Sequence, residues 1–481
     1  MTVRAIAVLA CGVWLAACSN TSGPTPGALA GTTGTSTLPV NGQAGSSANG
    51  SAGTGAIGAA GQSATVAGTG SIATTAGTSG SAAGTGSSAT AGMSGLADAD
   101  AGITPAADGG SSDAGAGAMP AEVKGCGDTK LYATPEDPGA TGPWPVGAKT
   151  VHLATSGGQE TVEIWYPAPI GSEAGKTAAT YDLSLNLPPS DRTKIPADQN
   201  TPQPCNCYRD LPIDTAHGPY PGVIFVHGLA SFRTASLTTM TQWASRGFIV
   251  AAADHLGEYL LDFTAGLCGG GGSGAPGNFN GDIDAELAAM TNKTGDFAFL
   301  GNSIDMTRVG IGGHSMGAGT VAGASTKPNV QVIILLAELG GSPIAMSSTL
   351  KSSLVMGGMV DTVTQWSADL SAYSGSPTPK RLVGITGGDH LDVTDICSQT
   401  NAAGETSIQV GVKNNVCALG IVNGLAHCGS MKDPKQGPEI VNYVSTAVLE
   451  TTLHCIDRSA SLVDATVMGK FSAIGAYQHS P

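Results

Sequence analysis

Basic residues are scarce in this 481-residue chain, which has 21 lysines and arginines against 36 aspartates and glutamates. The formal net charge is −15 at pH 7. Phosphate backbones and anionic lipid surfaces attract clustered positive charge. The composition therefore argues against a nucleic-acid partner and against adsorption to anionic lipid through charge, but it does not discriminate among neutral substrates.

The N-terminus lacks an apolar run long enough to span a bilayer, which takes roughly 20 residues. Arg4 precedes the shorter run 5–17, as in a secretory signal. The ending Leu15-Ala16-Ala17-Cys18 resembles a bacterial lipobox, in which the cysteine is lipidated and becomes the mature N-terminus. We expect a signal peptide at 1–18 and a membrane anchor through Cys18; an ordinary secretory signal is the alternative.

Ser19 follows this cysteine and is typical of outer-membrane sorting. We therefore expect an exported lipoprotein at the outer membrane or cell surface. Large apolar side chains are nearly missing from residues 19–122, which consist mainly of Gly, Ala, Ser and Thr. Such a segment cannot bury enough surface to offset its chain entropy. We predict a disordered tether at 19–122 and one folded domain at 123–481.

Ten cysteines are present, and eight remain after Cys11 in the signal and Cys18 are set aside. An even number in an oxidising compartment indicates disulfides. The four that crowd the C-terminal part are plausible partners for one another: Cys397, Cys417, Cys428 and Cys455. Cys205-x-Cys207 could belong to a metal site, but no matching Cys or His pair lies nearby, and we expect neither a metal nor a cofactor.

Apolar, β-rich runs alternate with helix-like intervals in the folded part. The expected strands are 162–166, 222–226, 248–253, 308–312, 330–337, 353–358 and 381–386, and the expected helices are 238–246, 282–291 and 439–453. Several runs are apolar on both faces, as in parallel strands covered by helices on each side. The pattern predicts an α/β fold with a mostly parallel, doubly wound sheet, interrupted by a glycine-rich loop at 268–280 and a cysteine-bearing insert at 395–436.

Gly313-His314-Ser315-Met316-Gly317 follows the expected strand 308–312 and precedes a small-residue segment, 318–324. This is the G-x-S-x-G pattern of a nucleophile elbow, the sharp turn of α/β hydrolases that projects a serine hydroxyl. In so glycine-rich a chain the pentapeptide alone is weak evidence. The preceding strand and the candidate partners downstream give it weight.

A serine hydroxyl needs a base to take its proton and a carboxylate to orient that base. His390 is the preferred base because it lies in a loop after the last expected strand. His427 and His454 are the alternatives. For the acid, Asp361 and Glu338 each follow an expected strand, and Asp361 is preferred because it lies one strand before the histidine.

Catalysis of acyl transfer also requires two N–H donors for the developing oxyanion. The residue after the nucleophile, Met316, supplies one. The other comes from the loop after an earlier strand, and Val226-His227-Gly228-Leu229 predicts the Leu229 N–H. We expect His227 to shape this loop rather than to act as a base.

Several blocks resemble known enzymes. Residues 220–234 and 245–252 closely resemble the platelet-activating-factor acetylhydrolase family, and 143–147 with 162–168 resemble the start of its bacterial, dienelactone-hydrolase-like members. The elbow 313–317 is similar to that of bacterial cutinases and polyester hydrolases. The resemblance extends with interruptions from about residue 138 to residue 456.

The resemblance implies a calcium-independent serine esterase acting on short or oxidised acyl chains of phospholipids. It maps the nucleophile onto Ser315 and the oxyanion donors onto Leu229 and Met316. For the acid, the animal acetylhydrolases favour Glu338 and the cutinase-like pattern favours Asp361. A dienelactone hydrolase is disfavoured because that chemistry uses a cysteine where Ser315 lies.

We therefore predict a serine carboxylic-ester hydrolase in which His390, oriented by Asp361, activates Ser315. A cutinase-like polyester hydrolase or general carboxylesterase is the second enzymatic hypothesis. A non-catalytic surface binding lipoprotein is the alternative of another class. The sequence does not predict the oligomeric state.

Overall fold

A computed structural model describes residues 119–481. The expected signal peptide, Cys18 and the tether up to residue 118 lie outside these residues. None of the helices within 119–481 combines the length and apolar character that a membrane span requires.

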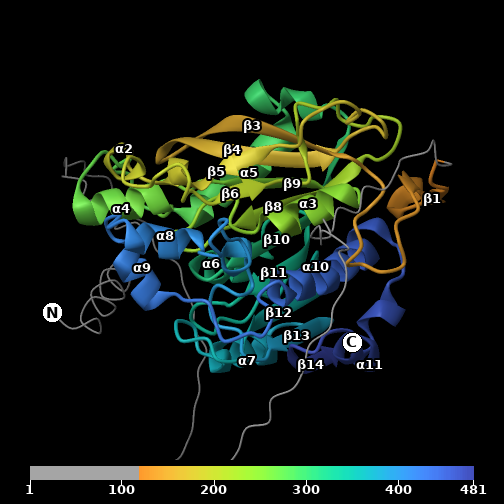
Figure 1. Cartoon of the computed structure of the whole chain (residues 1–481). Helices are drawn as coiled ribbons and strands as arrows, with labels where there is room; N and C mark the ends of the chain where they lie inside the picture. Colours follow the sequence, from red (N-terminus) through yellow and green to blue (C-terminus); the bar gives the residue numbers. More distant parts are fainter. Residues whose placement is uncertain (1–118) are drawn as a thin grey trace, which may run out of the picture. The chain divides into compact units, whose positions relative to one another are not determined.

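A ten-stranded mixed sheet forms the centre of the described chain (Figure 1). Its spatial order is β14 (Ile474–Ser480), β13 (Lys380–Ile385), β12 (Ser352–Gly358), β11 (Val330–Leu336), β10 (Ile304–His314), β8 (Tyr220–Val226), β9 (Ile249–Ala253), β4 (Gly158–Pro167), β3 (Val146–Thr155) and β7 (Tyr208–Arg209). The six adjacent strands from β13 to β9 are parallel to one another. The pairs of β14 with β13, β4 with β9 and β3 with β4 are antiparallel. Two small sheets pair β1 (Glu122–Lys124) with β2 (Lys130–Tyr132), and β5 (Thr180–Asp182) with β6 (Pro202–Pro204).

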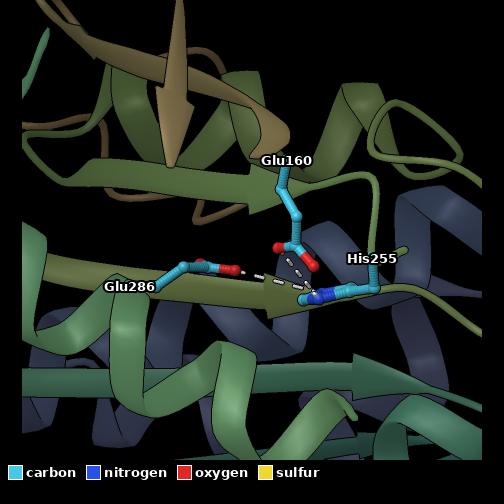
Figure 2. A group of neighbouring side chains, drawn as sticks. All are labelled: Glu160, His255 and Glu286. Atoms are coloured by element: carbon cyan, nitrogen blue, oxygen red, sulfur yellow. Dashed lines mark ion pairs between the residues drawn. The ribbon is translucent and has the colours of Figure 1, made fainter. Parts of the chain in front are cut away.

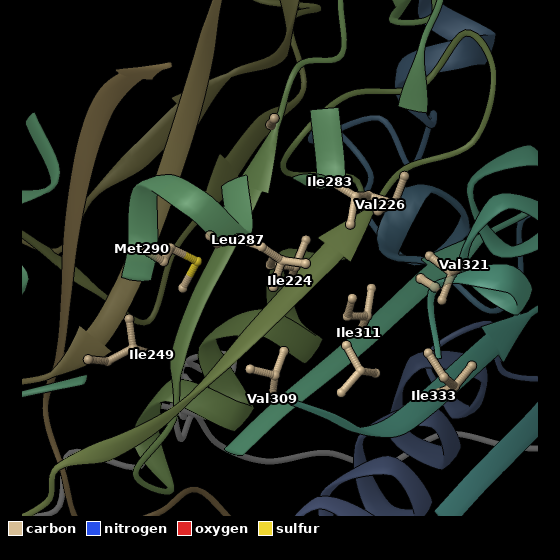
Figure 3. Close-up of a cluster of buried hydrophobic side chains, with 14 of the residues drawn as sticks. Ile224, Val226, Ile249, Ile283, Leu287, Met290, Val309, Ile311, Val321 and Ile333 are labelled. Carbon is tan, nitrogen blue, oxygen red and sulfur yellow. The ribbon is translucent and has the colours of Figure 1, made fainter. Parts of the chain in front are cut away.

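Helices pack on both faces of this sheet. Successive side chains of a strand point to opposite faces, and β8 divides accordingly: Ile224 and Val226 belong to one buried cluster, Val223 and Phe225 to another. The first cluster includes side chains of α5 (Phe279–Asn292), α6 (Met316–Ala324) and α7 (Trp366–Gly375), and Figure 3 shows part of it. The second includes side chains of α3 (Leu237–Ser245), α10 (Gln436–Leu449) and α11 (Asp464–Lys470).

The seven expected strands all coincide with strands of the large sheet, and the three expected helices coincide with α3, α5 and α10. The run at 162–166 lies in β4 and is antiparallel to β9, so it is not one of the parallel strands. This large mixed sheet with helices is compatible with the α/β-hydrolase fold that the sequence predicts.

Four further α-helices of residues 119–481 are short: α2 (Pro189–Arg192), α4 (Leu260–Cys268), α8 (Ser407–Lys413) and α9 (Leu419–Leu425). Two of them, α8 and α9, lie in the cysteine-bearing insert. The glycine-rich stretch 269–278 is a mostly exposed loop between α4 and α5, as expected of a surface excursion. In the cysteine-bearing insert, Val416 and Leu419 pack with Phe232 and Leu260 in a third buried cluster.

Four disulfides join the eight cysteines: Cys126–Cys455, Cys205–Cys207, Cys268–Cys417 and Cys397–Cys428. Only Cys397 and Cys428 pair within the C-terminal group of four. The expectation for Cys417 and Cys455 was wrong because their partners lie in distant segments that the fold brings together. Cys205 and Cys207 bond to each other.

Candidate active site

The proposed site residues lie in loops at one edge of the sheet. Leu229 follows β8, Ser315 follows β10, Asp361 follows β12 and His390 follows β13. These four strands belong to the parallel part of the sheet, so their carboxyl ends meet at the same edge. Residues separated by up to 161 positions in the sequence are thereby brought within reach of one another.

Ser315 occupies a sharp turn between β10 and α6. Its φ and ψ angles are 56° and −121°, a conformation that costs a non-glycine residue roughly 1–3 kcal/mol. Close packing holds this turn. A Cβ added to Gly317 would lie 2.4 Å from the His227 carbonyl oxygen, and one added to Gly228 would lie 2.9 Å from Ser315 Cβ. Gly317 of the motif and Gly228 of the 227–229 loop therefore allow the two backbones to approach each other.

A continuous hydrogen-bond chain links the three residues predicted as the triad. His390 Nε2 lies 2.8 Å from Ser315 Oγ, and His390 Nδ1 lies 2.9 Å from Asp361 Oδ2. All three residues are buried. With Asp361 ionised, Nδ1–H donates to the carboxylate and Nε2 accepts from the serine hydroxyl, which is the tautomer that a general base needs.

The carboxylate of Asp361 is fully hydrogen-bonded. Oδ1 accepts from the backbone N–H groups of Val363 and Thr364, each at 2.8 Å, and Oδ2 also accepts from Thr364 Oγ1 at 2.8 Å. Burial by itself raises the pKa of this group, but the hydrogen bond and charge of His390 and the bonds from Thr364 lower the pKa below its ordinary value. Asp361 is therefore ionised and fixed in position.

His314, the second residue of the elbow, positions His390 through the backbone. Its Nε2 lies 2.9 Å from the His390 carbonyl oxygen, and the two rings lie 4.8 Å apart. Burial, with the neighbouring His390, lowers the pKa of His314 to about 3. His314 is therefore neutral, and its Nε2–H donates to that carbonyl. On the other side, His390 N–H donates to Asp389 Oδ1 at 2.8 Å.

The two predicted oxyanion donors flank the nucleophile. Met316 is the first residue of α6, so its N–H has no acceptor one turn earlier in the helix. Leu229 N–H has no protein acceptor within residues 119–481. The loop that carries Leu229 is held by Ala230 N–H, which donates to the Glu258 carbonyl at 2.8 Å. Both amides are thus available for a ligand oxygen.

The alternative acid and bases have hydrogen-bond or packing partners other than Ser315 and His390. Glu338 Oε2 accepts from the backbone of Gly341 and Ser342, and His390 is not among its partners. His427 is half-exposed, and its ring contacts Thr362. His454 is fully buried against Phe248. The geometry therefore favours Asp361 and His390 over the three alternatives.

The contacts of His227 agree with the expectation that it shapes the 227–229 loop. Its Nε2 accepts from His255 N–H at 3.2 Å, so the proton is on Nδ1, which donates to the Gly228 carbonyl at 2.7 Å. Burial, with the neighbouring His255, lowers the pKa of His227 well below its ordinary value. A neutral imidazole with both nitrogens engaged braces the loop and has no free nitrogen to act as a base.

Sequence reasoning missed three supporting residues. Thr364 donates to the Asp361 carboxylate, and Asp389 accepts from the His390 N–H. His314 donates to the His390 carbonyl oxygen. His314 stands inside the recognised elbow motif, and Thr364 lies three residues after the predicted acid, a spacing at which a side-chain oxygen can receive local backbone N–H groups. The elbow motif could therefore have identified His314, and the three-residue spacing could have identified Thr364.

The cysteine-bearing insert borders the site. Ser430 N–H donates to the Gly387 carbonyl, and Gly429 N–H donates to Asp392. These contacts place the end of the insert against the loop that carries His390. The insert therefore contributes to the wall beside the proposed base.

One group of side chains within residues 119–481 brings potential metal ligands together: Glu160, His255 and Glu286. It contains none of the proposed catalytic residues.

Part of the chain matches a known family model. Residues 196–259 match the model described as platelet-activating factor acetylhydrolase, isoform II. The matched segment includes β8, Leu229, α3 and β9 and ends before the elbow. A search of curated proteins finds no match. The segment 196–259 thus confirms the expected resemblance: over these residues the chain is platelet-activating factor acetylhydrolase-like, which supports a carboxylic-ester hydrolase of the phospholipase or esterase type.

Proposed function

We propose that the chain is a serine carboxylic-ester hydrolase that works through an acyl-enzyme. The hydrogen-bond chain from Ser315 through His390 to Asp361 carries this proposal. The strained serine backbone and the two free amides of Leu229 and Met316 support it. A non-catalytic binding protein would have no need for a buried imidazole hydrogen-bonded to both a serine hydroxyl and a carboxylate.

In the proposed reaction His390 Nε2 takes the proton of Ser315 Oγ as the oxygen attacks the ester carbonyl carbon. The N–H groups of Leu229 and Met316 stabilise the negative oxygen of the tetrahedral intermediate. The imidazolium then gives its proton to the alcohol oxygen as the C–O bond breaks. Water, deprotonated by the same imidazole, attacks the acyl-serine and releases the acid and the free serine.

Exposed apolar side chains lie beside the proposed nucleophile. Leu229 is 40% exposed, Leu339 is 41% exposed and Val360 is 50% exposed. Leu339 N–H donates to the Ser315 carbonyl, and Val360 directly precedes Asp361. Apolar surface at the mouth of the site suits the acyl chain of a lipid ester. Together with the family match, it favours short-chain or oxidised acyl esters of phospholipids as substrates.

The fold and location belong to the same proposal. We propose a doubly wound α/β-hydrolase domain in residues 123–481, exported as a lipoprotein with Cys18 as its anchor. The four disulfides suit an oxidising compartment. Metabolic labelling with a fatty-acid analogue, compared with Cys18→Ala, tests the anchor: the analogue should appear in the wild type and be lost in the variant.

The substrate class is tested by rates of hydrolysis on purified protein. The series contains phospholipids with acetyl, butyryl, oxidised and palmitoyl chains at one position, p-nitrophenyl esters of the same lengths, and a polyester film. Short or oxidised phospholipids should give the highest kcat/KM, and Ser315→Ala should abolish all hydrolysis. Highest activity on the film would instead favour a polyester hydrolase, and no hydrolysis of any ester by the wild type would contradict the proposal.

A further inference from the structure

A group of buried polar side chains lies apart from the triad (Figure 2). Glu160 extends from β4, His255 follows β9, and Glu286 lies on α5. Figure 2 shows the three side chains pointing toward one another. One donor atom from each lies within 4.8 Å of the others. Asp282, one helical turn before Glu286, also faces the imidazole, with Oδ2 3.3 Å from His255 Nδ1.

The atoms that converge are the ones that lack partners. The exposed fractions are 1% for Glu160 and 0% for both His255 and Glu286. Glu160 Oε2, His255 Nε2 and both carboxylate oxygens of Glu286 have no hydrogen-bond partner within residues 119–481. A buried carboxylate without a hydrogen bond or a counter-charge is strongly disfavoured. The unpartnered atoms therefore point to a ligand.

The group also lacks a cationic side chain. No lysine or arginine of the described chain forms an ion pair with Glu160, Asp282 or Glu286. Three carboxylates around one imidazole are the surroundings that a bound cation would neutralise.

We propose that Glu160, His255 and Glu286 bind a divalent transition-metal ion of the Zn²⁺ or Mn²⁺ type. One imidazole nitrogen with carboxylate oxygens suits these ions, whereas Ca²⁺ and Mg²⁺ prefer oxygen ligands alone. Nε2, the unpartnered ring nitrogen, is the ligand, and Nδ1–H donates to Asp282. A carboxylate commonly orients a metal-bound histidine in this way.

The separation of the donors fits such an ion after small side-chain rotations. Metal–ligand bonds of about 2.1 Å in a tetrahedral site place neighbouring donors about 3.4 Å apart. His255 Nε2 and Glu286 Oε1 are 4.0 Å apart. Glu160 Oε2 lies 3.8 Å from His255 Nδ1, so this side chain must rotate toward Nε2 to bind the same ion. Glu286 lies on a helix and Glu160 on a strand, so both carboxylates are held on rigid elements and can close on the ion by side-chain rotation.

The site would brace the oxyanion loop. His255 N–H donates to His227 Nε2, and the His227 ring bonds to the Gly228 carbonyl. An ion that joins β4, the end of β9 and α5 therefore fixes the support on which the 227–229 loop rests. This role is structural, and the metal site does not depend on the proposed ester hydrolysis.

The test measures bound metal in the purified full chain. The protein is incubated with Zn²⁺ or Mn²⁺, freed of excess metal and assayed by inductively coupled plasma mass spectrometry, and its melting temperature is followed with and without prolonged EDTA treatment. About one ion per chain and a lower melting temperature after EDTA are expected. Metal at background level with both ions, together with no effect of EDTA, would overturn the proposal.

Variants locate the ion. Glu286→Gln and Glu160→Gln should each lose the metal and the sensitivity to EDTA. Asp369→Asn is the matched control, because Asp369 is equally buried, also has an unpartnered carboxylate oxygen and lies outside the group; it should retain one ion per chain. Full metal content in Glu286→Gln would contradict the assignment. If that variant does not fold, the wild-type metal content and EDTA response decide the matter.

Discussion

At the scale of single residues, environment separates two carboxylates that look equivalent in the sequence. Asp361 and Glu338 both follow parallel strands of the same sheet. Asp361 accepts from His390 and is held by Thr364, whereas Glu338 turns to the backbone of its own loop. Burial raises the pKa of Glu338, while the bonds to Asp361 outweigh burial and lower its pKa. Only Asp361 is placed to orient the base.

Substitution of each carboxylate in turn separates their roles. Asp361→Asn should lower kcat on a soluble p-nitrophenyl ester by about 10³- to 10⁴-fold, because the amide stabilises the wrong imidazole tautomer. Glu338→Gln should change kcat by less than about tenfold, since Glu338 does not touch His390. Melting curves of both variants control for folding. An equal loss in the two variants, or a larger loss in Glu338→Gln, would reassign the acid.

At the scale of elements, the elbow depends on close contact between backbones. Three loops at the carboxyl edge contain a non-glycine residue with positive φ: Ala230 after β8, Ser315 after β10 and Ala337 after β11. Such conformations persist when the surroundings over-determine them, and they gather at functional sites. The packing of α6 against the 226–228 backbone supplies that constraint at Ser315.

Two alanine substitutions in α6 test this constraint. A Cβ at Gly317 would lie 2.4 Å and 2.5 Å from the carbonyl oxygens of His227 and Val226, whereas a Cβ at Gly323 meets no atom within 4 Å. Gly317→Ala should therefore destabilise the fold by about 3 kcal/mol or more, because backbone must shift. Gly323→Ala should stabilise it by up to about 1 kcal/mol through helix propensity.

Urea unfolding followed by circular dichroism gives both free energies of unfolding. Gly317→Ala should have a lower free energy of unfolding than the wild type, and Gly323→Ala a slightly higher one. Equal stability of Gly317→Ala and the wild type would show that the elbow and the 226–228 backbone are not packed as described.

At the scale of the whole described unit, its N-terminal segment is tied to residues 450–458, which follow α10. The Cys126–Cys455 disulfide spans 329 positions of sequence. Nearby, the buried Glu450 carboxylate pairs with Arg246 and Arg458, whose guanidinium groups also donate to backbone carbonyls of residues 134–140. Burial alone would raise the pKa of Glu450, but the two arginines lower it below its ordinary value.

The disulfides should differ in their contribution to stability according to the loop that each closes. Loop-closure entropy assigns about 6 kcal/mol to Cys126–Cys455 and about 1–2 kcal/mol to Cys205–Cys207, which are two positions apart. Paired serine substitutions at 126 and 455 should therefore lower the free energy of unfolding far more than those at 205 and 207. Denaturant unfolding of the two variants measures the difference, and a larger loss for the 205–207 pair would contradict the account.

The strands, the elbow and the oxyanion loop could be predicted because their signals are local. An apolar run, a glycine pair around a serine, or His227-Gly228 after a strand can each be recognised within a dozen residues. The two candidate acids could only be ranked in order of preference, since Asp361 and Glu338 follow adjacent strands. Which of them reaches His390 depends on the conformation of the loops. The partners of Cys417 and Cys455, and the Glu160, His255 and Glu286 group, come from separate elements and have no characteristic spacing in the sequence.

The central claim is that Ser315 is an activated nucleophile, and covalent labelling tests it most directly. A fluorophosphonate probe is incubated with the purified wild type, with Ser315→Ala and with wild type unfolded in urea, and the labelled peptide is identified by mass spectrometry. The account predicts one label per folded wild-type chain, on Ser315, and none in the variant or the unfolded protein. Labelling that persists in Ser315→Ala, or a folded wild type that remains unlabelled, would contradict it.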